Sequence, residues 1–153
     1  WDEIIFGMFN GRLGTSMDFP NLHRRLLNGS TADYTRTWKQ RLDEARAAIA
    51  ARDFARLAVV AEHNCLKMHS VMWASRPPVV YWNAATLACL ERVRELQADG
   101  VAAFFTIDAG PQVKVICLPA DESQVVEALS NTPGVESVLA SGIGTGAALM
   151  NGI

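Results

Sequence analysis

The chain has 153 residues, half of them apolar and a fifth charged, with a net charge of −2 at pH 7. These values predict one globular domain spanning residues 1–153, which can bury roughly 70% of its unfolded surface. The small negative charge disfavours a nucleic-acid-binding protein, and no apolar stretch reaches the roughly 18 residues of a membrane helix. We therefore expect neither nucleic acid nor membrane among the partners.

The three cysteines, Cys65, Cys89 and Cys117, are odd in number, widely spaced and set within apolar patterns. This usage predicts reduced core thiols and a cytoplasmic protein, not a disulfide or metal framework. His63 and His69 are six residues apart, so on a helix they would face different ways and indicate no metal site.

The first residue is Trp1, not Met, which leads us to expect that an upstream part of the protein is missing. The segment Trp1–Thr15 is apolar but is interrupted by three glycines, a pattern that favours a strand and a turn over a helix.

Two amphipathic helices are predicted next. In Tyr34–Ala51 the apolar residues recur every three or four positions with charged residues between them. Asp53 is a suitable N-cap for a second helix, which starts at Phe54 and ends near Trp73, because the prolines that follow Arg76 forbid its continuation. The short connection predicts a helical hairpin.

A third helix is expected to begin after Asn83 and to end at Gly100. Apolar strands are then predicted at Val101–Ile107 and Val113–Leu118, joined by a tight turn at Asp108–Pro111 in which glycine and proline supply the turn chemistry.

A short fourth helix follows Pro119. Asp121 and Gln124 have the spacing of a capping box, and a last strand is predicted at Val135–Ala140. The glycine-rich tail from Gly142 resembles a dinucleotide-binding loop, but the helix and further strand that such a loop requires do not follow it.

The order of these elements predicts an α+β fold, a two-layer sandwich of helices on a small, mostly antiparallel sheet.

Two separated blocks of sequence resemble the mevalonate diphosphate decarboxylases. Thr106–Lys114 reads Thr-Ile-Asp-Ala-Gly-Pro-Gln-Val-Lys and is similar to the glycine-proline loop of that family, with Gln112 in place of the usual Asn. The second block, Asn64–His69 followed by Arg76–Trp82, lies upstream at the expected separation. The resemblance runs from about residue 14 to residue 139 and covers only the carboxyl-terminal half of a family member.

The resemblance implies a fold like the carboxyl-terminal domain of the GHMP kinase superfamily. It also implies ATP-dependent decarboxylation of mevalonate 5-diphosphate to isopentenyl diphosphate. ATP and Mg²⁺ would be bound mainly by the absent amino-terminal half, so this fragment would be inactive alone. Asp108 is then the expected catalytic base, and Ala109 and Gly110 would keep bulk away from the bound substrate.

Further site residues follow from the same resemblance. Ser16 aligns with a serine that contacts the substrate's phosphates, whereas Met17 stands where the family commonly has a phosphate-binding Arg. Asn64 and Lys67 are three residues apart on the second predicted helix and could present an amide and an ammonium to the substrate beside Asp108.

Two other functions stay open. Because Met17 stands in place of that Arg, the chain could instead belong to a related enzyme that acts on mevalonate or mevalonate monophosphate. Alternatively, the chain could be a non-catalytic binding module in which the loop serves only the fold. Family members tend to be homodimers, so a homo-oligomer is expected.

Overall fold

A computed structural model describes residues 31–144 of the chain, with side chains from residue 38 onward. The predicted strand at Trp1–Thr15 lies outside these residues. The described elements, in chain order, are α3 (Thr31–Ala50), α4 (Phe54–Trp73), α5 (Ala84–Ala98), β1 (Ala103–Thr106), β2 (Lys114–Cys117), the short 3-10 helix η1 (Pro119–Asp121) and α6 (Glu122–Ser130).

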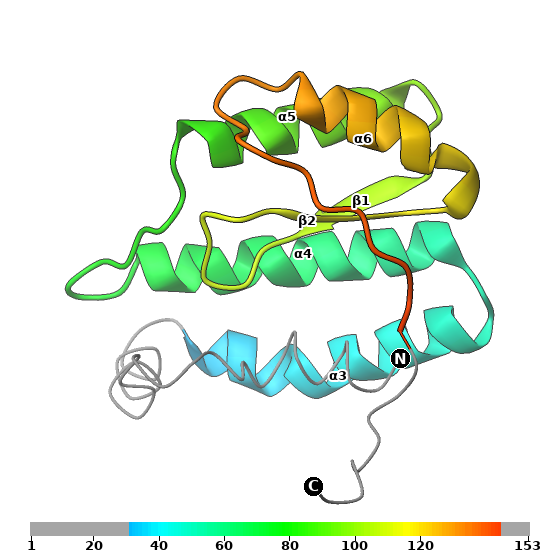
Figure 1. Ribbon diagram of the computed structural model, residues 1–153. Coiled ribbons are helices and arrows are strands. Elements are labelled where there is room, and N and C mark those ends of the chain that lie inside the picture. The colour runs from blue at the N-terminus through cyan, green and yellow to red at the C-terminus, as the bar shows by residue number, and fades with distance from the viewer. Residues whose placement is uncertain (1–30, 145–153) are drawn as a thin grey trace, which may run out of the picture.

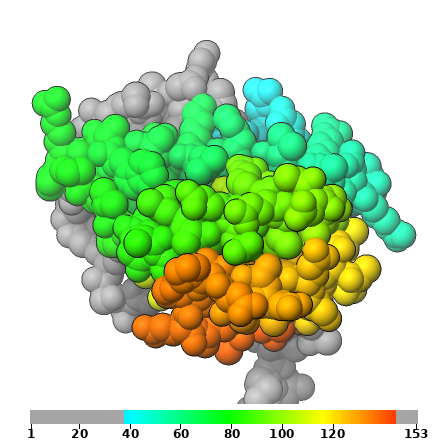
Figure 2. Space-filling model, turned by 90° about the horizontal axis from the view of Figure 1, so that it is seen from above, coloured from blue at the N-terminus to red at the C-terminus, as the bar shows by residue number. Residues whose placement is uncertain are grey.

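The elements are stacked in layers (Figure 1). Helix α4 lies between α3 and the strands, and α5 and α6 lie on the other side of the strands. Seen from that side, α5 runs between α4 and α6 (Figure 2). Helices and a small antiparallel sheet confirm the predicted α+β class. None of the described helices is long and apolar enough to cross a membrane.

The predicted helical hairpin is formed by α3 and α4. The turn between them uses Arg52 at a positive φ of 54°, and the Asp53 carboxylate accepts a hydrogen bond from the Arg56 amide at 2.9 Å. This bond satisfies one of the amides that a helix start leaves unpaired, as the sequence predicts for an N-cap.

Helix α5 begins with a reciprocal cap. The Asn83 side chain accepts from the Thr86 amide at 2.9 Å, and the Asn83 amide donates to Thr86 Oγ1 at 3.2 Å. Both the predicted cap and the predicted end near Gly100 are confirmed, since the helix stops at Ala98 and Gly100 follows with a φ of +86°.

Strands β1 and β2 form an antiparallel hairpin in which Ala103 is opposite Cys117 and Thr106 is opposite Lys114. All four residues of β1 are buried, because helices lie on both sides of the strand. The main core surrounds Phe105 and is built from α4, α5, α6 and the β1 region. Its buried members are Cys65, Cys89, Val93, Leu96, Val101, Ala103, Phe105, Ile107, Val125 and Leu129.

The predicted capping box at Asp121 is wrong. Asp121 ends η1 with a helical backbone (φ −101°, ψ −4°), whereas an N-cap needs an extended one. Its carboxylate instead accepts a hydrogen bond from the Ala102 amide at 3.2 Å.

The predicted strand at Val135–Ala140 is also wrong, because this segment joins no sheet within the described chain. Val135 and Val138 both pack against the core, and Leu139 is 92% exposed. The two inward residues are three apart, whereas a strand turns every second residue to the same face.

Candidate functional site

Asp108 lies just beyond the end of β1, in the loop that joins the paired residues Thr106 and Lys114. Its side chain is 34% exposed and forms an ion pair with Lys114, which is 57% exposed. Within the described part of the chain, the loop therefore presents a partly accessible carboxylate that is paired with one lysine.

Side chains hold the edge of β1 that does not face β2. Gln97 donates to the Ala103 carbonyl at 2.8 Å, and the buried Glu62 carboxylate accepts from the Phe105 amide at 3.2 Å. These bonds satisfy strand groups that no other strand reaches in the described structure.

Ile107, the residue before Asp108, is held at both of its backbone groups by α4. Its amide donates to Cys65 Sγ at 3.2 Å, and its carbonyl lies 3.1 Å from His69 Nε2. Cys65 and His69 are four residues apart on one face of the helix, which is why both reach the same residue.

The far side of the loop is held by α5 and by the segment before it. Thr86 Oγ1 donates to the Pro111 carbonyl at 2.9 Å. Gly110 has a φ of +93°, and a Cβ at this position would lie 3.3 Å from Trp82 Cδ1 and 3.4 Å from Ile107 Cγ2. The positive φ therefore favours glycine, and a side chain here would in addition crowd Trp82.

An aromatic cluster lies beneath the loop. The His69 ring centroid is 4.7 Å from that of Trp82, which in turn packs edge-on against Trp73 at 4.8 Å. His69 is fully buried, and burial lowers its pKa below 6.5. Burial also raises the pKa of the Cys65 thiol to about 11. Both side chains are therefore neutral at neutral pH.

The other predicted site residues are placed as follows. Ala109 and Gly110 are half-buried in the loop beside Asp108. Asn64 is only 4% exposed and accepts a hydrogen bond from Arg41 Nε of α3 at 3.0 Å. Lys67 is half-buried on α4. Ser16 lies outside the described residues. The structure thus brings Asp108, Ala109 and Gly110 together, while Asn64 faces α3.

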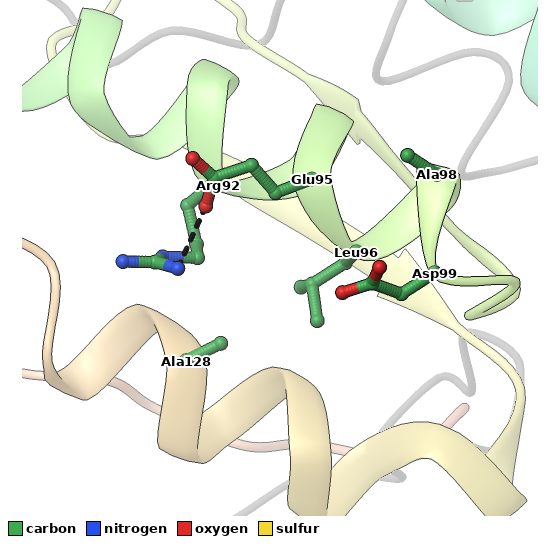
Figure 3. A pocket seen from close by; sticks show the side chains of 6 residues that line it. All are labelled: Arg92, Glu95, Leu96, Ala98, Asp99 and Ala128. Carbon is green, nitrogen blue, oxygen red and sulfur yellow. Dashed lines mark hydrogen bonds and ion pairs between the residues drawn. The ribbon is translucent and has the colours of Figure 1, made fainter.

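A groove between α5 and α6 contains none of the predicted site residues (Figure 3). Arg92 and Glu95 form an exposed ion pair at 2.7 Å along it, and Leu96 and Ala128 supply apolar contacts. No group of three or more potential ligands is placed to hold a metal ion in the described part of the chain.

Comparison with known proteins identifies the family. Residues 31–144 match the family described as "Mevalonate 5-diphosphate decarboxylase C-terminal domain". The chain belongs to this family.

One curated relative and two solved structures support the match. The diphosphomevalonate decarboxylase of Candida albicans is 28% identical over 90 residues, which are 59% of this chain and 25% of that protein. The mevalonate diphosphate decarboxylase of Enterococcus faecalis is 28% identical, with a TM-score of 0.68 over 76% of this chain and 36% of that one. The structure of MDDEF in complex with MVAPP, AMPPCP and magnesium is 29% identical, with a TM-score of 0.67 over 72% of this chain and 35% of that one.

This member of the mevalonate 5-diphosphate decarboxylase family spans about a quarter to a third of the length of these relatives. Like the family description, the match concerns the carboxyl-terminal domain.

Sequence reasoning in this decarboxylase-family domain missed the residues that hold the Asp108 loop, namely Cys65, His69, Thr86 and Lys114. The spacing of Cys65 and His69 was available as a signal, since residues four apart on a helix face the same neighbour. The sequence identified Asn83 as a helix cap but gave no role to Thr86, whose hydrogen bond to Pro111 joins residues 25 positions apart.

Proposed function

We propose that this chain is the substrate-side domain, spanning residues 1–153, of an ATP-dependent mevalonate 5-diphosphate decarboxylase. The products would be isopentenyl diphosphate, ADP, phosphate and carbon dioxide. The observation that carries the proposal is the Asp108 carboxylate, which is accessible to solvent within a loop that is hydrogen-bonded at both ends and belongs to the family signature.

The chemistry explains why a fixed carboxylate is needed here. The substrate's tertiary alcohol attacks the γ-phosphate of ATP, and a positioned base must take up the hydroxyl proton. Lys114 pairs with Oδ2 of Asp108, so we assign Oδ1 as the atom that accepts the proton. The C–O bond of the phosphate ester that forms then breaks, and phosphate leaves with the bonding electrons. The positive charge that develops on this carbon favours loss of carbon dioxide, because the electron pair of the broken C–C bond forms the double bond of the product.

We propose that ATP and Mg²⁺ bind mainly to the part of the complete protein outside this domain, as the family resemblance implies. When bound, Mg²⁺ neutralises charge on the phosphoryl oxygens. The structure of a relative in complex with MVAPP, AMPPCP and magnesium supports an ATP-like nucleotide and Mg²⁺ as ligands of the family. We therefore expect the isolated chain to be inactive.

On the substrate side, Ala109 and Gly110 leave room beside Asp108, and Ser16 is proposed as a phosphate contact. Lys67 and Asn64 are proposed as further polar contacts from α4. For Asn64 this requires substrate to reach an amide that is 4% exposed, so we rank it below Lys67.

Three free thiols favour the reducing cytoplasm as the site of action. We also propose a homo-oligomer, as the family resemblance implies.

A second candidate activity rests on Met17, which stands where the family commonly has a phosphate-binding Arg. An enzyme of this family that lacks that Arg could prefer mevalonate or mevalonate monophosphate. The third candidate, a binding module without catalysis, would keep the loop for folding only.

The test compares mevalonate 5-diphosphate and mevalonate 5-phosphate as substrates of the complete protein, with ADP release and thermal shift as readouts. We expect turnover of the diphosphate and a stabilisation of about 2.7 kcal/mol at roughly a hundredfold excess over the dissociation constant. Turnover of the monophosphate alone would select the second candidate. If the protein shows neither turnover nor a thermal shift with either ester, the third candidate, the binding module, is selected.

A further inference from the structure

His69 of α4 is completely buried beside the Asp108 loop. Its Nε2 lies 3.1 Å from the Ile107 carbonyl, which can only accept a hydrogen bond, so Nε2 carries the hydrogen. The one N–H group of the neutral ring therefore donates to the residue that precedes Asp108.

Packing alone does not explain a histidine at this position. The other ring nitrogen, Nδ1, is buried without a hydrogen-bond partner within the described structure, and burying an unpaired polar atom is unfavourable. A phenylalanine would fill the same space against Trp82 and Trp73 without this penalty. What it would lose is the hydrogen bond to Ile107.

That bond lies at the point where the loop leaves the sheet. Ile107 is held by Cys65 and His69 from α4, and Pro111 is held by Thr86 from α5. Of the two contacts on the Ile107 carbonyl, the Cys65 thiol is a weak donor at 3.7 Å, so His69 supplies the stronger bond. His69 is therefore the stronger of the two side-chain restraints on the carbonyl of the peptide between Ile107 and Asp108.

We propose that His69 is a positioning residue whose Nε2–H bond to the Ile107 carbonyl fixes the direction of the Asp108 carboxylate. The inference rests on the proposed function of Asp108. On this inference, a residue of α4 that does not contact the substrate sets the orientation of the catalytic base.

The experiment uses the complete protein with His69→Phe, which keeps a ring but removes the donor, and His69→Gln, whose amide restores a donor at a similar reach. His63→Phe is the matched control, because it makes the same change at an exposed position on the same helix. Each variant is measured for kcat, for KM and for amide hydrogen exchange at residues 108–110.

For His69→Phe we expect kcat to fall about 10- to 100-fold with KM within about threefold, since a displaced catalytic group slows the chemical step. Exchange at residues 108–110 should become about five- to tenfold faster because one anchoring bond is lost. His69→Gln should recover most of both effects, and His63→Phe should match the wild type.

Unchanged exchange and unchanged kcat in His69→Phe would overturn the proposal, as would an equal loss in His69→Gln. If His69→Phe fails to fold, His69→Gln decides alone: kcat and exchange near the wild-type values support the proposal, and a large loss of both in a folded protein overturns it. Faster exchange in His69→Phe, in a protein that turns over no mevalonate ester, would support the anchoring role while rejecting the proposed function.

Discussion

At the scale of single residues, His69 links folding to pH. Burial lowers its pKa in the folded protein, so the folded state favours the neutral ring. Burial of the neutral ring therefore makes the free energy of unfolding depend on pH. The full stability is present above about 6.5, the ordinary pKa of histidine, and stability is lost as pH falls from there through the lowered pKa of the folded state.

We therefore predict that the free energy of unfolding, measured by urea titration, decreases between pH 7 and pH 5 and that His69→Gln makes this decrease smaller. His63→Gln serves as the control and should keep the wild-type slope, because His69 is intact in it. Identical slopes in the wild type and in His69→Gln would show that His69 does not titrate with folding.

The thiols provide a second prediction at this scale. Burial raises the pKa of all three, to about 11 for Cys65, and only a thiolate is reactive. Cys65 and Cys89 are buried, whereas Cys117 is half-exposed. Iodoacetamide at pH 8 should therefore label Cys117 first, as read by peptide mass spectrometry, and urea should make all three equally reactive. Labelling of Cys65 as fast as Cys117 in the folded protein would contradict the structure.

Which residues the sequence could predict depends on how local their roles are. Asp108 and Gly110 belong to a turn that consecutive residues of the sequence identify, and the structure places them together. The hydrogen bond of His69 joins residues 38 positions apart. The spacing of Cys65 and His69 shows that they share a helix face, but no local pattern identifies Ile107 as their partner. Asn64 could be placed on α4 but not oriented, because its partner Arg41 lies on another helix.

At the scale of elements, Glu62 ties α4 to both β1 and α5. Its buried carboxylate accepts from the Phe105 amide and from Gln97 Nε2, and it pairs with Arg94. Arg94 also lies over the Phe105 ring at 5.1 Å. One side chain thus joins three elements around the strand that leads to Asp108.

We predict that Glu62→Ala lowers the free energy of unfolding by about 1–3 kcal/mol, because it leaves the Phe105 amide without its acceptor. Glu95→Ala is the matched control, since Glu95 also pairs with an arginine but at the surface. Its cost should stay below about 0.5 kcal/mol. Equal costs in urea titrations of the two variants would mean that the buried bonds add nothing.

The helices were predictable because their apolar periodicity and caps lie within the sequence of each element. Predicted and observed ends of α3 and α4 agree within a few residues. The strands are shorter than predicted, since pairing is confined to Ala103–Thr106 and Lys114–Cys117. Val135–Ala140 has the composition of a strand, but strand formation also needs a partner, which composition does not reveal.

At the scale of the whole molecule, the fold supports the Asp108 loop from two directions. Helix α4 holds the end of β1, and the start of α5 holds Pro111. The proposed reaction needs in addition a nucleotide site, which we assign to the remainder of a protein about three to four times the length matched here. On the proposed function, this domain would contribute the base and catalysis would depend on assembly with that remainder.

The most direct test of this account is ATP-dependent release of carbon dioxide from mevalonate 5-diphosphate by the complete protein and its Asp108→Asn variant. Asp99→Asn, at the exposed end of α5, is the control. We predict that Asp108→Asn reduces the rate about 10²- to 10⁴-fold at an unchanged melting temperature, because general-base catalysis contributes that much, while Asp99→Asn keeps the wild-type rate. A wild-type rate from Asp108→Asn would contradict the assignment of Asp108 as the base.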